Sequence, residues 1–145
     1  MYCRFMVILK TVEEIAILRE GGRRLAHILK ELEEMVAPGV SSVDLEYKAR
    51  ELCEKYEGKP AFMGYTPRGA GRPFPSALCL SINDAVVHGI PQEEEYIIEE
   101  GDIVTLDMGL IYKNLITDSA ITVGVGKIDE KAKKLLEAGD RKSVV

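Results

Sequence analysis

The sequence of 145 residues has no tryptophan and is short of cysteine, histidine and long apolar stretches. Its three cysteines, Cys3, Cys53 and Cys79, are widely spaced and odd in number, and they form no C-x-x-C pair. This spacing argues against a disulfide framework and is typical of free thiols. We therefore expect a reducing, cytoplasmic location.

An excess of basic residues is also absent, since 19 Lys+Arg stand against 24 Asp+Glu and the formal net charge is −5. Nucleic acid is therefore not expected as the main partner, because binding its phosphates requires clustered cations. The apolar run Phe5–Leu9 is far shorter than the roughly 20 residues that cross a bilayer. It also lacks a small-residue cleavage site, so neither a membrane span nor a signal peptide is expected.

What is present is a composition that can bury a core, with 46% apolar and 30% charged residues. The length is typical of one domain. A capping box, Thr11-Val-Glu-Glu14, opens a predicted helix whose apolar residues recur at helical spacing to Met35. A second predicted helix opens at Ser41 and ends before Gly58.

The remainder alternates between short apolar runs and turn residues. Gly and Pro make Pro60–Pro75 a predicted long loop. A last helix is predicted over Glu130–Ala138, after which no period continues. Together these elements predict one mixed α+β domain. The predicted strands are Phe5–Leu9, Ala77–Ile82, Val86–His88, Ile103–Met108 and Asp118–Val125.

Two acidic residues, Asp107 and Asp118, are predicted to share one face of a hairpin. If the turn is centred on Tyr112-Lys113 they lie directly opposite, and if it is centred on Lys113-Asn114 they are diagonal neighbours. Like charges across a ladder destabilise a sheet, so a bound cation or a shared proton is expected to offset the repulsion. Paired carboxylates suit Mn, Fe, Co or Zn. The alternative is two solvated hairpin acids.

His88 is the second candidate, because it precedes Gly89-Ile-Pro91, where a side chain could face a cleft. Histidine is the usual general acid or base near neutral pH. The alternative is an ordinary surface histidine.

At this point several motifs in a fixed order, from about Ile8 to Ala138, resemble type I methionine aminopeptidase. The motifs are Pro60-Ala-Phe-Met-Gly-Tyr65, Phe74-Pro-Ser-Ala-Leu-Cys-Leu-Ser-Ile-Asn83, Val87-His-Gly-Ile-Pro91, Gly101-Asp-Ile-Val104, Asp107-x-Gly109, Tyr112 and Thr117-Asp-Ser-Ala120. The resemblance implies the pita-bread fold, of which this chain would be the first half. It also implies an enzyme that removes the initiator methionine from the N-terminus of a nascent chain. A proline-specific hydrolase of the same fold is a further alternative, which the Pro60–Tyr65 and Val87–Pro91 motifs disfavour.

The resemblance also implies a role for seven residues. Asp107 and Asp118 match two ligands of a site for two divalent metal ions (Co, Mn, Fe or Zn), and His88 matches a catalytic, substrate-contacting histidine. The residues that match the pocket for the methionine side chain are Phe62, Tyr65, Phe74 and Cys79. The implied mechanism is metal-assisted peptide hydrolysis, in which the metals activate a bridging water, polarise the carbonyl and anchor the free amino terminus.

The sequence departs from the family in two respects. The stretch between Tyr65 and Phe74 is longer than the family's usual spacing, and the family's three further ligands, a His and two Glu, do not appear. We therefore expect residues 1–138 to be a truncated aminopeptidase domain, nearly inactive alone, with residues 139–145 as a tail outside the family. The alternative is a non-catalytic half-fold that binds a partner or has a structural role, including a homodimer.

Overall fold

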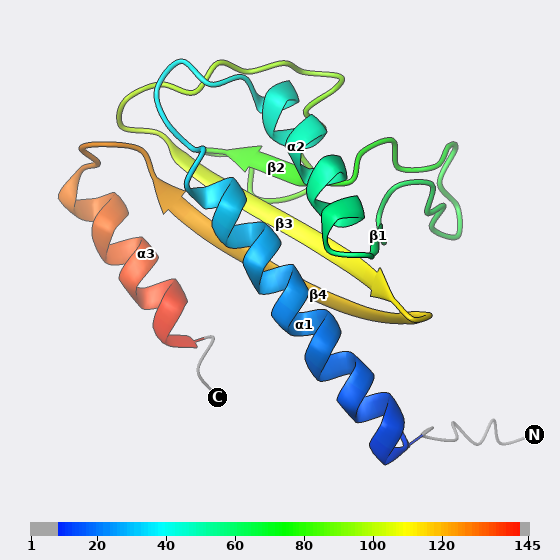
Figure 1. Cartoon of the computed structure of the whole chain (residues 1–145). Coiled ribbons are helices and arrows are strands. Elements are labelled where there is room, and N and C mark those ends of the chain that lie inside the picture. Colours follow the sequence, from blue (N-terminus) through cyan, green and yellow to red (C-terminus); the bar gives the residue numbers. More distant parts are fainter. Residues whose placement is uncertain (1–8, 143–145) are drawn as a thin grey trace, which may run out of the picture.

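The computed structural model describes residues 9–142, so the predicted strand Phe5–Leu9 lies outside the described residues except for Leu9. Two helices cover one face of a four-stranded antiparallel sheet, and a third lies beside the last strand (Figure 1). The elements are α1 (Val12–Glu33), α2 (Ser42–Lys55), β1 (Lys59–Pro60), β2 (Cys79–Ile82), β3 (Ile103–Tyr112), β4 (Leu115–Gly124) and α3 (Glu130–Lys142).

Strand β3 is the centre of the sheet. The short strands β1 and β2 pair with different parts of one of its edges, and β4 pairs along the whole of the other edge. The β3–β4 turn is made by Lys113 and Asn114, which both have positive φ values, of 47° and 64°. Two left-handed residues in succession form the tight turn that matches the twist of a hairpin. The turn therefore determines the register of the whole β3–β4 ladder.

The core lies between the helices and one face of β3. The predicted capping box is confirmed: the Glu14 N–H donates to Thr11 Oγ1 at 3.1 Å and the Thr11 N–H donates to Glu14 Oε2 at 2.9 Å. No helix of residues 9–142 combines the length and apolarity needed to cross a membrane. The central core residues are Leu25, Ile28 and Leu32 of α1, Leu45 and Leu52 of α2, and Val104, Leu106, Met108 and Leu110 of β3.

Several predicted elements differ from the structure. Strand β2 begins at Cys79 and not at Ala77, and β4 spans Leu115–Gly124 where Asp118–Val125 was predicted. Val86–His88 is not a strand, because its chain turns through a left-handed residue at His88. Strand β3 continues past Met108 to Tyr112, since β4 and β1 supply pairing partners for its far end. Helix α3 continues past Ala138 to Lys142. The two-residue strand β1 was not predicted; its second residue, Pro60, is the first residue of the predicted loop.

A buried carboxylate connects α2 to the start of β2. Glu46 of α2 has no exposed surface. Its Oε1 accepts the Ala77 N–H and its Oε2 accepts the Leu78 N–H, both at 2.8 Å. The Arg50 Nε–H donates to Oε1 at 2.7 Å. The carboxylate therefore satisfies two main-chain donors inside the core and holds the segment that leads into Cys79.

We predict that Glu46→Ala lowers the free energy of unfolding by about 3 kcal/mol, because it leaves two buried N–H donors and the Arg50 guanidinium without their partner. Chemical denaturation followed by circular dichroism measures the change. Glu51→Ala is the matched control: Glu51 lies on the same helix in an exposed pair with Lys48, where less than about 1 kcal/mol is expected. Equal effects of the two variants would contradict the role of Glu46.

Candidate active site

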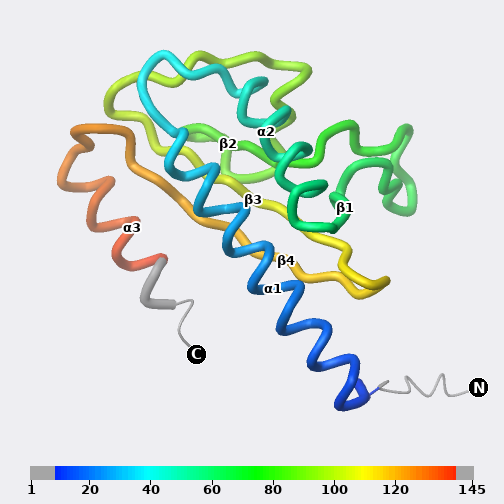
Figure 2. The backbone as a smooth tube through the Cα atoms, viewed as in Figure 1, coloured from blue at the N-terminus to red at the C-terminus, as the bar shows by residue number. Residues whose placement is uncertain are grey.

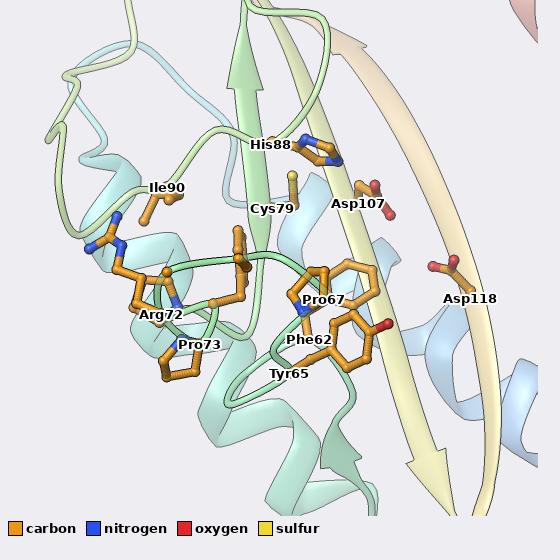
Figure 3. Close-up of a pocket in the computed structure, with 14 residues that line it drawn as sticks. Phe62, Tyr65, Pro67, Arg72, Pro73, Cys79, His88, Ile90, Asp107 and Asp118 are labelled. Carbon is orange, nitrogen blue, oxygen red and sulfur yellow. The ribbon is translucent and has the colours of Figure 1, made fainter.

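A pocket of about 570 Å³ lies on the face of the sheet opposite the core. It is lined by residues of the 60–75 segment, of β2, of the 88–90 segment and of the β3–β4 hairpin (Figure 3). All seven residues that the sequence singled out line it: Phe62, Tyr65, Phe74, Cys79, His88, Asp107 and Asp118. Segments far apart in the sequence thus converge on one cavity.

The two aspartates are diagonal neighbours on the pocket face. Asp107 is paired with Ala120, and Asp118 with Gly109. This is the register expected for a turn at Lys113-Asn114, so direct opposition of the two carboxylates is excluded. Gly109 leaves the position across from Asp118 without a side chain, and both aspartates point into the pocket (Figure 3).

The two carboxylates differ in their surroundings. Asp107 is half-buried and Asp118 is exposed. Burial raises the pKa of Asp107, the negative charge of Asp118 raises it further, and His88 acts in the opposite direction. The pocket therefore contains an unfavourable concentration of negative charge, which a bound cation would relieve.

The described residues fit part of a divalent metal site. Asp107 and Asp118 offer carboxylate oxygens from neighbouring strands, and such oxygens are suitable ligands for divalent metals. Within residues 9–142, no group of three or more His, Cys, Asp or Glu side chains is placed to hold a metal ion. The pair would thus account for two positions in a larger set of ligands.

His88 is held against β2 in a left-handed conformation, with φ of 64°. The Leu80 N–H donates to the Gly89 carbonyl at 3.1 Å, and the Gly89 N–H donates to Ser81 Oγ at 3.2 Å. A Cβ at Gly89 would lie 1.8 Å from the Leu80 carbonyl oxygen, so only glycine fits this approach. The sequence analysis did not single out Ser81; the glycine after His88 was the available signal of a close backbone contact.

The rest of the pocket is largely apolar. Phe62 and Phe74 meet edge to face with their ring centroids 6.4 Å apart, and Tyr65 lies at the rim with 62% of its surface exposed. Burial raises the pKa of the Cys79 thiol; the His88 main chain opposes this by hydrogen bonding and the charge of Asp107 adds to it. The thiol is consequently neutral at neutral pH, and it contributes a soft apolar surface.

Residues 16–141 match metallopeptidase family M24. The chain belongs to this family, in agreement with the paired carboxylates and the fold. The match ends within the segment 139–145 that the sequence pattern placed outside the family.

The curated relatives are methionine aminopeptidases. The chain is 50% identical to methionine aminopeptidase of Aquifex aeolicus over 125 residues, which are 86% of this chain and 48% of the relative. It is 37% identical to methionine aminopeptidase of Clostridium acetobutylicum over 132 residues, 91% of this chain and 50% of the relative. The chain therefore spans about half the length of these relatives.

Solved structures confirm the α+β, pita-bread fold. Methionine aminopeptidase from Thermotoga maritima superimposes with a TM-score of 0.80 at 38% identity, covering 91% of this chain and 50% of that one. Xaa-Pro dipeptidase from Bacillus anthracis gives a TM-score of 0.70 at 25% identity, covering 87% and 32%. The chain thus has the architecture of about half of a methionine aminopeptidase.

We predict that Asp107→Asn raises the free energy of unfolding at pH 7, by up to about 1 kcal/mol, because it removes a buried charge next to Asp118. A carboxyl whose pKa is raised on folding stabilises the fold below its unfolded pKa, near 3.9, and this contribution is lost as the pH rises through the folded value. The gain from the substitution should therefore disappear only below the unfolded pKa, at about pH 3. Urea unfolding with chelator at both pH values measures it.

The exposed Asp84 provides the control, since Asp84→Asn removes the same charge outside this pair and should change stability little at either pH. A loss of stability at pH 7 in Asp107→Asn would contradict the electrostatic account of the pair.

Proposed function

We propose that this chain carries the methionine pocket and two of the metal ligands of a methionine aminopeptidase, which removes the initiator methionine from the free N-terminus of a peptide or nascent chain. The supporting observation is the convergence of the four pocket residues, His88 and the two aspartates on one cavity. Free, buried Cys53 and Cys79 are compatible with the proposed cytoplasmic location.

Asp107 and Asp118 are the proposed metal ligands. When bound there, divalent ions such as Co, Mn, Fe or Zn polarise the scissile carbonyl and activate water for peptide hydrolysis. The half-buried Asp107 offers one carboxylate held in the strand, and the exposed Asp118 offers a second on the neighbouring strand. Since two carboxylates do not complete a ligand set, we infer that the other ligands come from outside residues 9–142.

His88 is the proposed catalytic histidine. Its left-handed backbone and the contacts of Gly89 with Leu80 and Ser81 hold it at the edge of the pocket, on the side of Asp107 (Figure 3). In this place the imidazole can donate a hydrogen bond to the substrate next to the bond that is cleaved.

The remaining pocket residues are proposed to receive the methionine side chain. Phe62 and Phe74 supply aromatic surface, Tyr65 forms the rim, and the neutral Cys79 thiol lies at the sheet. A thioether is polarizable and makes favourable contacts with aromatic rings and sulfur. The apolar lining therefore favours methionine over polar side chains.

We predict that substoichiometric Mn²⁺ broadens the amide NMR signals around Asp107 and Asp118, because the paramagnetic ion binds between them. In a separate metal-free sample, adding L-methionine amide should shift signals at Phe62, Phe74 and Cys79. In Asp107→Asn the broadening should disappear, whereas the methionine-induced shifts at the aromatic residues should remain. Both effects are measured in ¹H–¹⁵N correlation spectra.

The exposed acidic run Glu93–Glu95 is the internal control, because non-specific Mn²⁺ binding would broaden its signals equally. Broadening there, or uniform broadening, would count against the metal site. Hydrolysis of a Met-Ala-Ser peptide by the purified chain with Mn²⁺, lost in Asp107→Ala, would overturn the expectation that the chain alone is nearly inactive.

A second candidate is a non-catalytic half-fold that assembles with a second copy. Among the described residues, β4 pairs only with β3, so no strand occupies its outer edge, beside which α3 lies. On this strand Ile116 is 60% exposed on the same face as Asp118. A two-fold dimer across this surface would bring the aspartates of both copies together, as four carboxylates able to share a cation.

Analytical ultracentrifugation tests the second candidate. A dimer at micromolar concentration that dissociates when Ile116 is replaced by Lys is expected if the β4 surface forms the interface. The exposed Leu135 of α3 provides the control, because Leu135→Lys adds the same charge on another element. A monomer in all three cases would exclude the homodimer.

A further inference from the structure

One wall of the pocket is built by a loop that leaves the body of the protein and returns to it. This segment, Thr66–Pro73, is called the 66–73 loop below, and it belongs to the excursion of the backbone between β1 and β2 (Figure 2). The loop is closed at its base, where the Phe74 N–H donates to the Tyr65 carbonyl at 2.9 Å and the Gly64 N–H donates to the Phe74 carbonyl at 2.8 Å. Tyr65 and Phe74 are therefore adjacent whatever the loop between them does.

The loop has a defined internal shape. The Ala70 N–H donates to the Pro67 carbonyl at 3.0 Å, and Gly69 has φ of 91°. A glycine with positive φ at the third position of a four-residue turn is typical of type II. Pro67 and Pro73 restrict the backbone at the two ends of the loop. The turn and the two prolines therefore hold the shape of the loop, although all of residues 66–73 are exposed.

The two ends of the loop line different parts of the pocket: Pro67 lies beside Phe62 and Tyr65, whereas Arg72 and Pro73 line the part that is remote from the carboxylates (Figure 3). Arg72 and Pro73 lie near Ile90, on the side away from Asp107 and Asp118 (Figure 3). A side chain that enters from the carboxylate end meets this part of the loop last. The loop residues that line the pocket are Pro67, Ala70, Gly71, Arg72 and Pro73.

An ion pair fastens the loop to Glu93, whose N–H donates to the carbonyl of the pocket residue Ile90 at 3.1 Å. The Arg72 Nη2 donates to Glu93 Oε2 at 2.6 Å, and Nη1 contacts Oε1, so the pair is bidentate. Because Glu93 neutralises it, Arg72 acts here as a wall rather than as a receptor for an anion. The two side chains are 63% and 37% exposed, so the pair positions the loop and contributes little to overall stability.

We propose that the 66–73 loop, fastened by the Arg72–Glu93 pair, sets the greatest length of side chain that the pocket accepts. This inference rests on the proposed function, since it concerns the same methionine pocket. Side chains of the length of methionine end before the wall, whereas longer unbranched side chains displace the loop and break the ion pair.

The structure makes the loop separable from the fold. Its base is already closed by the Tyr65–Phe74 hydrogen bond, so a two-residue Asn-Gly turn can replace residues 66–73. Because the replaced residues are exposed, the thermal unfolding midpoint should change little. Unfolding of the variant is recorded first, to show that the pocket is still framed by a folded protein.

The test compares two probes, L-methionine amide and S-butyl-L-homocysteine amide, whose side chain is longer by three methylenes. Dissociation constants come from ¹H–¹⁵N NMR titrations. The unmodified chain should bind the methionine probe about tenfold more tightly than the longer one. In the loop-replaced variant the ratio should approach one, mainly through tighter binding of the longer probe.

Two point variants distinguish the effect of losing the Arg72–Glu93 ion pair from the effect of losing a positive charge in the loop. Arg72→Ala should reduce the discrimination, because the wall loses both a side chain and its fastening. Arg68→Ala removes the same charge from the same loop, but Arg68 does not line the pocket, so discrimination should be unchanged.

Each other outcome overturns the proposal. Unchanged discrimination in the loop-replaced variant refutes the inference and leaves the proposed function standing. Loss of both probes in a folded loop-replaced variant shows that the loop forms the pocket and does not limit it. No binding of the methionine probe to the unmodified chain refutes the methionine pocket itself, and the inference with it.

Discussion

Strand β3 has one face in the hydrophobic core and the other in the pocket, and the positions of the other elements depend on this. Its residues alternate between a fully buried row, Val104, Leu106, Met108 and Leu110, and a row that faces the pocket and includes Asp107. The buried row packs with α1 and α2 in the core. Because one face is buried, a slip by one residue would move Asp107 into the core, so burial determines the register of the site.

The second strand and the loops depend on this frame through main-chain hydrogen bonds. Glu46 holds the Ala77–Leu78 segment against α2, so Cys79 enters the sheet opposite Asp107. The 88–89 segment is in turn held on β2 by Leu80 and Ser81. Each of these hydrogen bonds lies one or two residues along the chain from a pocket residue, Cys79 or His88. Exposed segments are therefore held in place and form a defined cavity.

The functional proposal follows from this convergence together with the family. Membership of metallopeptidase family M24 and identity to methionine aminopeptidases establish the lineage, while the chain spans about half of those relatives. The proposed metal site is incomplete in residues 9–142, because no third His, Cys, Asp or Glu side chain joins Asp107 and Asp118. The apolar part of the pocket, in contrast, is lined by several described residues, among them residues of the 66–73 loop.

The sequence by itself determined the α+β class, the capped first helix and the strand alternation that puts Asp107 and Asp118 on one face, because these depend on local spacing. It left two hairpin registers open, and the left-handed pair Lys113 and Asn114 decided between them. The strand predicted at Val86–His88 is absent because Gly89 contacts Leu80 and Ser81 of β2; the glycine itself signals a close contact, but the sequence does not give its partner. The burial of Glu46 and the Arg72–Glu93 ion pair likewise required tertiary structure, since the partners lie far apart in the sequence.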